Sequence, residues 1–148
     1  MKTIIAALDF SDASTSVLEN AAEMATALGA PLHIVHVLEP EPSYAAYGFT
    51  PEEFPAIRTF QEEARARAEK SLEDQKGKVG EAQVETMLLE GNPLHTLLDY
   101  AEAQDDPLVV VGTHGHGVIA SMLLGSVAEG VVRKGKVPAL IVPAPQRK

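Results

Sequence analysis

The chain has 148 residues, enough for one domain with a sizeable core and too few for two ordinary ones. Its formal net charge is −9 and its basic residues form no long cluster, which makes nucleic acid and anionic membranes poor partners. It contains no cysteine, which excludes disulfides, thiolate nucleophiles and iron–sulfur clusters.

Location and domain organisation follow from the same survey. No run approaches the roughly 20 apolar residues that a membrane-spanning helix needs, and the first residues lack the small-residue cleavage site of a signal peptide. We therefore expect a cytoplasmic protein without a membrane partner. One domain is predicted over residues 1–143, followed by a loose tail at 144–148.

The first half of the chain begins with an apolar run from Thr3 to Leu8 that ends at Asp9, the pattern of a strand buried on both faces of a parallel sheet. A helix follows, with one apolar face between Val17 and Leu28, and Gly29 ends it. The second predicted strand is 32–37. Strand and helix thus alternate from the start.

A proline-rich loop at 39–55 comes next, and together with the start of the following helix it holds most of the aromatic residues. Its length is typical of a lid or of a contact with a partner protein. The simpler interpretation, which we favour, is that the rings cover the sheet edge beside a long loop.

The second half continues the alternation with a charged helix at about 56–76 and a third strand at 84–89. Asn92 and Pro93 then provide the cap and the first residue of a helix that runs to about Gln104. Two more strands, 108–111 and 139–142, enclose a helix at about 127–134. The connections are long enough for parallel pairing, so we predict a doubly wound α/β fold with a five-stranded parallel sheet and helices on both faces.

A glycine-rich segment lies between the last two strands and reads Gly112-Thr-His-Gly115-His-Gly117-Val-Ile-Ala-Ser-Met-Leu-Leu-Gly125-Ser126. Glycines after a strand allow a tight turn and let backbone N–H groups approach an anion without a Cβ in the way. A helix that starts just beyond adds free N–H groups and the positive end of its dipole. The segment therefore suits a polyphosphate. Ser126 and Glu129 also fit a capping box, so Ser126 has two compatible roles, starting the helix and contacting phosphate.

The spacing of Gly112, Gly115 and Gly125-Ser126 equals the nucleotide motif of one family: Gly, two residues, Gly, nine residues, Gly, then Ser or Thr. The chain resembles the universal stress proteins of the ATP-binding subgroup. Its opening, 4–11, and its close, 137–142, are similar to the family's first and last strands.

This resemblance implies strand order 3-2-1-4-5, with ATP lying over the ends of strands one and four. Open α/β sheets bind ligands where the strand order reverses, which is between the same two strands. By the resemblance, Asp9 accepts hydrogen bonds from the ribose and backbone groups near Val37 hold the adenine. The remaining nucleotide-binding residues are expected to be Gly112, His114, Gly115, Gly125, Ser126 and Val127. A divalent cation, Mg²⁺ or Mn²⁺, is expected on the phosphates and not in a metal site built by the protein.

Three residues depart from the family pattern. Ala7 stands where proline is frequent, and Ala128 stands where a hydroxyl residue can contact phosphate. His116 occupies a position that is often basic; since the reference pKa of histidine is about 6.5, a neutral His116 would weaken phosphate binding or make it depend on pH.

Other interpretations fit the residues less well. Gly115 to Ala120 matches a dinucleotide-binding pattern, but that pattern needs an acidic residue at the end of the next strand, where this chain has Val142-Pro143. His33 and His36 point to opposite faces of one strand, so they cannot share a metal ion.

Two functions remain open. The first is a module that senses or holds ATP and changes its protein contacts, at most a slow ATPase, because no evident general base is paired with a charge-stabilising arginine. The second is an ATP hydrolase or nucleotidyl-transferring enzyme in which Asp9 or His114 takes part. Turnover of ATP separates the two.

A homodimer is expected through the last strand, 139–142, which is an outer strand in the order 3-2-1-4-5. One of its sides carries unpaired N–H and C=O groups, and neither inward charges nor an internal proline protect it. Pairing with a second copy about a two-fold axis satisfies these groups, and the family resemblance implies the same contact. The alternative is a monomer in which the tail at 144–148 covers the edge.

Overall fold

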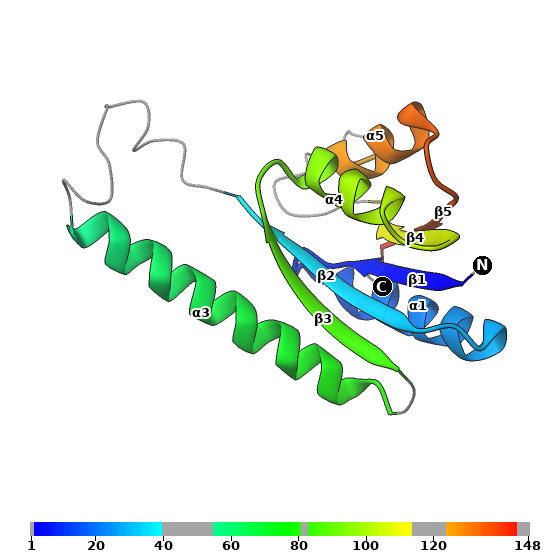
Figure 1. The fold of residues 1–148 in the computed structure, drawn as a ribbon, viewed down its shortest axis with the longest axis horizontal. Helices are drawn as coiled ribbons and strands as arrows, with labels where there is room; N and C mark the ends of the chain where they lie inside the picture. The colour runs from blue at the N-terminus through cyan, green and yellow to red at the C-terminus, as the bar shows by residue number, and fades with distance from the viewer. Residues whose placement is uncertain (1, 40–54, 81–82, 114–123, 145–148) are drawn as a thin grey trace.

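A five-stranded, all-parallel sheet forms the centre of the molecule (Figure 1). The structure is a computed structural model and describes residues 2–39, 55–80, 83–113 and 124–144. Its strand order is β3-β2-β1-β4-β5, which confirms the predicted order. The strands are β1 (Thr3–Ala7), β2 (Leu32–Leu38), β3 (Val84–Glu90), β4 (Pro107–Gly112) and β5 (Ala139–Val142). The helices are α1 (Ser14–Leu28), α3 (Pro55–Lys78), α4 (Pro93–Glu102) and α5 (Ser126–Lys134).

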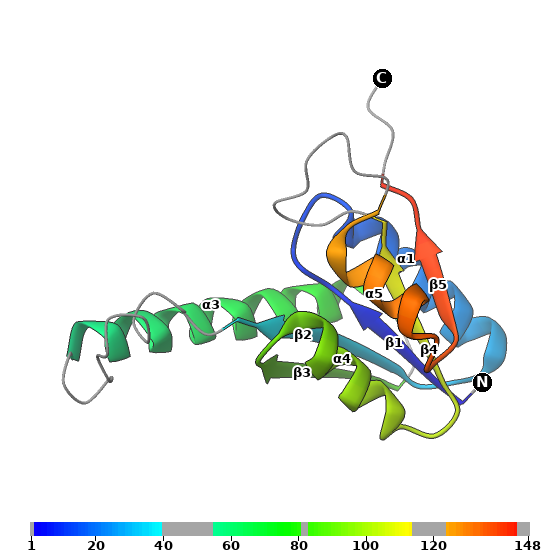
Figure 2. The same ribbon diagram turned by 90° about the horizontal axis from the view of Figure 1, so that it is seen from above.

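Two apolar clusters bury the two faces of this sheet. On one face, Ile4 and Ile34 pack with residues of α1 and with Leu72 of α3. On the other, Ile5 and Val109 pack with residues of α4 and α5. Figures 1 and 2 show the same division, with α1 and α3 on one side and α4 and α5 on the other. Because both faces are covered, the central strands are continuous apolar runs, which is the signal that predicted them.

The helix ends follow the predicted chemistry in two cases. Gly29 ends α1 with φ 62°, a left-handed conformation that glycine adopts without steric cost. Asn92 caps α4, because its side-chain oxygen accepts a hydrogen bond of 3.0 Å from the backbone N–H of His95. These local signals are strong enough to fix a boundary from sequence.

The predicted capping box at the start of α5 is wrong. Gly125 is the N-cap of this helix, Ser126 is its first helical residue, and no side-chain cap bond forms. Glu129, the expected partner of Ser126, forms an ion pair with Arg133 one turn further on. The helix starts one residue earlier than the pattern requires, which shifts Glu129 out of the position from which it could bond back.

Parts of the prediction fall on residues that the structure does not describe. The aromatic loop is outside the described residues from 40 to 54, as is the tail from 145. Helix α3, which follows the loop, extends past the end of the sheet (Figure 1), and Phe60 is 41% exposed near its start. No helix within the described ranges is long and apolar enough to cross a membrane.

Helices α4 and α5 approach each other closely at Gly130. A Cβ added to this glycine would overlap Cδ2 of Leu94 and lie 2.8 Å from Cδ1, so the leucine would have to move. The missing side chain therefore lets α5 pack on the first turn of α4, the turn that carries Leu94.

We predict that Gly130→Ala gains none of the roughly 0.5–1 kcal/mol that alanine usually adds to a helix in place of glycine, because the half-buried side chain of Leu94 has to move to make room. Chemical denaturation measures the change. Gly77→Ala in α3 is the matched control: nothing lies within 4 Å of its added Cβ, so a gain of about 0.5–1 kcal/mol is expected there. If Gly130→Ala gains stability as Gly77→Ala does, the close contact with Leu94 is not present in solution.

Candidate functional site

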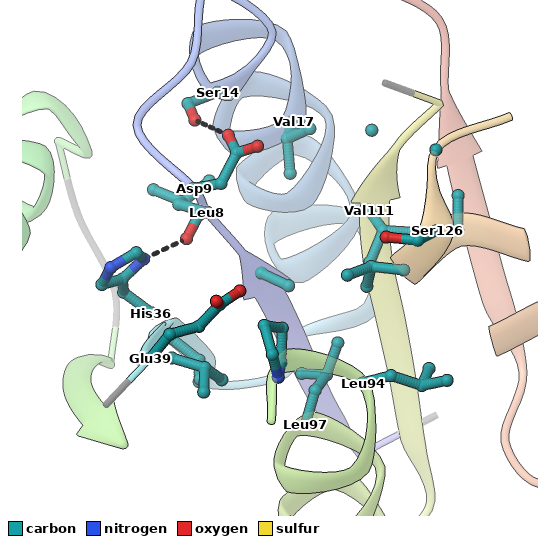
Figure 3. Close-up of a pocket in the computed structure, with 18 of the residues that line it drawn as sticks. Leu8, Asp9, Ser14, Val17, His36, Glu39, Leu94, Leu97, Val111 and Ser126 are labelled. Carbon is teal, nitrogen blue, oxygen red and sulfur yellow. Dashed lines mark hydrogen bonds between the residues drawn. The ribbon is translucent and has the colours of Figure 1, made fainter. Parts of the chain in front are cut away.

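A cavity of about 650 Å³ opens at the carboxyl ends of β1, β2 and β4 (Figure 3). The sheet order reverses between β1 and β4, so the chain leaves β1 for α1 on one face and leaves β4 for α5 on the other. The diverging connections leave space between them, which is why ligand sites in open α/β sheets occur here. The first turns of α1, α4 and α5 close the sides of this space.

The cavity brings together every predicted site residue that the structure describes. Its lining includes Asp9 from the end of β1, Val37 from β2 and Gly112 from β4, and also Gly125, Ser126 and Val127 at the start of α5. His114 and Gly115 lie outside the described residues, as does His116. Residues far apart in the sequence therefore share one cavity, as the predicted strand order requires.

Asp9 is held in a defined orientation at the start of α1. Its Oδ1 accepts a hydrogen bond of 2.9 Å from the backbone N–H of Ser11. It accepts a second bond, of 3.3 Å, from the hydroxyl of Ser14 (Figure 3). The first bond closes a local turn of the kind that aspartate forms with the residue two positions on. Ser14 is buried, so the carboxylate is anchored against the body of α1.

Phe10, the next residue, has a backbone that glycine would adopt more easily. Its φ is 63°, which costs a residue with a bulky side chain about 1–3 kcal/mol. The ring of Phe10 packs against the ring of His36, with centroids 4.5 Å apart and planes tilted by 38°. Such strain persists only where surrounding contacts enforce it. No pattern in the sequence predicts this conformation.

The two ends of the glycine-rich segment meet at the cavity. The backbone N–H of Gly125 donates a hydrogen bond of 2.6 Å to the carbonyl oxygen of Thr113, and the N–H of Thr113 donates to Val142 in β5. Gly125 is buried and has φ −68° and ψ 161°, an extended conformation open to any residue. The backbone angles of Gly125 therefore do not by themselves require glycine at this position.

The first turn of α5 presents backbone donors to the same space. The first intrahelical bond of this end runs from the N–H of Glu129 to the carbonyl of Gly125, so the N–H groups of Ser126, Val127 and Ala128 have no partner within the helix. Together with the helix dipole they favour an anion. Ala128 is buried beside the cavity, and its methyl group has no hydroxyl with which to contact an anion.

Apolar walls that the sequence did not single out complete the cavity. The walls come from two strands and from α4 and are formed by Val35, Leu94, Leu97 and Val111. Figure 3 labels the last three. Helix α4 reaches it because Gly91 donates a backbone hydrogen bond of 3.1 Å to Leu38 at the end of β2. The cap at Asn92 was visible in the sequence, but the bond to β2 depends on the register of two strands that are distant in the chain.

A second polar cluster lies away from the cavity, where Tyr100 of α4 bonds to His33 of β2 at 2.7 Å. Burial, and to a lesser extent the nearby carboxylate of Glu85, raises the pKa of the Tyr100 hydroxyl above its usual 10.0. The hydroxyl is therefore neutral at physiological pH, and the contact stabilises the packing of α4 on the sheet. His36, as predicted, faces the opposite side.

An open parallel sheet with a cavity at its strand-order reversal defines the class of doubly wound ligand-binding α/β domains. Within that class, the chain belongs to the universal stress protein family, whose model matches residues 1–143. It is 35% identical over 141 residues to the "Universal stress protein in QAH/OAS sulfhydrylase 3'region" of Thermus aquaticus, with 95% of this chain and 98% of the relative covered.

Solved structures of other proteins share the fold. The structure of MJ0577 from Methanocaldococcus jannaschii superposes with a TM-score of 0.75 and 25% identity, covering 99% of this chain and 98% of that one. A universal stress protein crystallised in complex with cAMP gives a TM-score of 0.63 and 31% identity, with coverage of 97% and 98%.

Proposed function

We propose that the cavity binds ATP and that the protein is a stress-response module that senses or holds this nucleotide, with slow or incidental hydrolysis. One observation carries the proposal: the carboxylate of Asp9, the backbone of Val37 at the end of β2 and the N-terminus of α5 all border a single cavity. Its volume lies within the range of about 300–1,000 Å³ usual for small-molecule sites. The relative crystallised with cAMP supports an adenine nucleotide as the ligand.

The end of β2 suits the base. Pairing between β1 and β2 ends at Ala7 and Val35, after which the N–H of Leu8 bonds to Val35 at 2.9 Å. The backbone of Val37, two residues on, has the same orientation as Val35 but faces the cavity instead of a strand. Its donor and acceptor complement the ring nitrogen and amino group of adenine, and the apolar walls suit the faces of the ring.

Asp9 and α5 suit the rest of the nucleotide. The anchored carboxylate of Asp9 can accept hydrogen bonds from ribose hydroxyls, while the N-terminus of α5 favours phosphate. Mg²⁺ or Mn²⁺ would be held by the phosphates, consistent with the oxygen ligands that these ions prefer.

The lining of the cavity favours binding over rapid hydrolysis. Among the described residues that line it, none is lysine or arginine, and the segment 114–123 contains neither. Fast phosphoryl transfer uses such cations to stabilise the charge on the transferred group. Calorimetry with ATP, and mass spectrometry of nucleotide released from natively purified protein, test the proposal. Absence of both binding and bound nucleotide would refute it, and release of many equivalents of ADP per minute would favour the enzyme.

Asp9→Ala is predicted to lower the affinity for ATP about tenfold and the affinity for inorganic triphosphate much less, because a hydrogen bond to a charged group contributes about 1.5–3 kcal/mol. Calorimetry with both ligands measures the difference. Asp12→Ala is the matched control, since Asp12 is exposed in the same loop and does not line the cavity. Equal losses for both ligands would contradict the assignment of Asp9 to the nucleoside.

Gly125→Val is predicted to abolish measurable ATP binding while the protein stays folded. The extended backbone at this position accepts valine, so the effect should come from the bulk of the side chain at the phosphate end. Gly125→Ala should give a smaller loss. Gly80→Val, whose Cβ has no neighbour within 4 Å, is the control. Unchanged affinity in folded Gly125→Val would exclude phosphate from this place.

A homodimer through β5 is the second part of the proposal. β5 pairs with β4 on one side and is the last strand of the sheet, and no other strand of the described ranges pairs with its outer side. The N–H of Val109 bonds to Pro138 and that of Thr113 to Val142. Residues 138, 140 and 142 therefore turn their backbone groups toward β4, while Ala139 and Ile141 turn theirs outward.

Ile141→Pro is therefore predicted to convert a dimer into a monomer without removing a bond to β4, because it deletes an outward N–H. Light scattering coupled to size exclusion measures the mass at micromolar concentration. Thr86→Pro in β3 is the control, since by the register with β2 its N–H faces outward at the opposite edge. A wild-type monomer would refute the dimer, and a dimer that survives Ile141→Pro would exclude β5 as its interface.

A further inference from the structure

His36 contacts the residue on each side of Asp9. Its Nδ1 lies 2.7 Å from the carbonyl oxygen of Leu8 (Figure 3), and its ring packs against Phe10. A carbonyl oxygen only accepts, so Nδ1 carries the hydrogen and donates it. His36 itself is half-buried and belongs to the lining of the cavity.

The hydrogen bond from His36 replaces a rung of the sheet. In a parallel ladder that continued past Val35, the carbonyl of Leu8 would accept from the N–H of Val37. Here the histidine ring bonds to that carbonyl, and the chain turns out of β1 toward α1. The ring thus bonds to the carbonyl of Leu8, just past the end of β1, and leaves the backbone N–H and C=O of Val37 available to the cavity.

The ring contact with Phe10 acts on the other side of Asp9. Phe10 has the left-handed backbone that directs the chain from the strand end into the turn closed by Asp9 and Ser11. Packing on the His36 ring opposes the relaxation of that backbone to an ordinary conformation. One side chain from β2 therefore restrains both neighbours of the Asp9 carboxylate, which follows the end of β1.

We infer that His36 is a positioning residue for the nucleoside end of the cavity. It acts through Leu8 and Phe10 to preorganise Asp9, and through Leu8 to keep the edge of Val37 open. Its role toward a nucleotide rests on the proposed function, whereas its role toward Asp9 does not. Preorganisation of this kind increases affinity because less ordering remains to be done on binding.

Three substitutions separate the two contacts of His36. His36→Leu removes both, His36→Phe keeps a ring against Phe10 but has no donor, and His36→Asn keeps an N–H donor near the position of Nδ1. His33→Leu is the matched control, because His33 lies on the same strand but faces Tyr100 on the other side of the sheet. Circular dichroism establishes that each variant is folded before it is compared.

The first readout needs no ligand. Hydrogen exchange by NMR follows the amide of Ser11, which donates to Asp9. We expect exchange about tenfold faster in His36→Leu, since the turn loses the contacts that hold it. His36→Asn should restore part of the protection, and His33→Leu should leave it unchanged. Unchanged exchange in His36→Leu would overturn the inference, as would equal acceleration in His33→Leu.

The second readout is affinity for ATP and for inorganic triphosphate. We expect His36→Leu and His36→Phe to lower the affinity for ATP about tenfold and to change the affinity for triphosphate by less than about twofold. Equal losses for the two ligands, or ATP affinity unchanged although Ser11 exchanges faster, would overturn the role in nucleoside binding. A wild-type protein that binds no ATP, but whose Ser11 amide responds to His36→Leu, would refute the proposed function and support the positioning of Asp9.

Discussion

The reversal of strand order beside β1 is the constraint on which the rest of the structure depends. β1 pairs with β2 on one side and β4 on the other, and its residues Ile4, Ile5 and Ala6 are fully buried. The chain leaves β1 toward one face of the sheet and β4 toward the opposite face. The space between the two connections cannot be filled by either helix, so a cavity there follows from the connectivity itself. Side chains decide only what that cavity recognises.

The contents of the cavity divide according to the element that supplies them. Strand interiors and the first turn of α4 contribute apolar surface, because those residues also belong to the core between helix and sheet. Polar groups come from strand ends and helix starts, where the backbone has donors and acceptors that no regular structure uses. The apolar walls and the backbone groups of Val37 suit a flat base. The N–H groups at the start of α5 suit an anion joined to that base. The described residues that line the cavity include no lysine or arginine.

Much of this arrangement could be predicted from sequence because its causes are local. Strands buried on both faces are apolar runs, and Gly29 and Asn92 mark helix ends by their own conformational preferences. Asp9, Val37 and Gly112 stand at strand ends, and parallel pairing brings such ends to one edge. The capping box at Ser126 failed because its pattern tolerates no shift of one residue in the start of α5. The contribution of α4 was missed because it depends on the bond from Gly91 to β2, which no local pattern encodes.

The contacts of His36 show why strand-end geometry is the hardest part to derive. An apolar run predicts that β1 exists, but it does not say whether the last carbonyl bonds to the next strand or to a side chain. Here the His36 ring bonds to the carbonyl of Leu8 and packs on Phe10. The hydrogen bonds between β1 and β2 therefore end before the one that Val37 would donate to Leu8. The left-handed backbone of Phe10 is a consequence of that exit and not a preference of phenylalanine. The backbone N–H and C=O of Val37 are therefore available to a ligand because β1 ends beside them. If β1 continued, the same groups would be hydrogen-bonded to it.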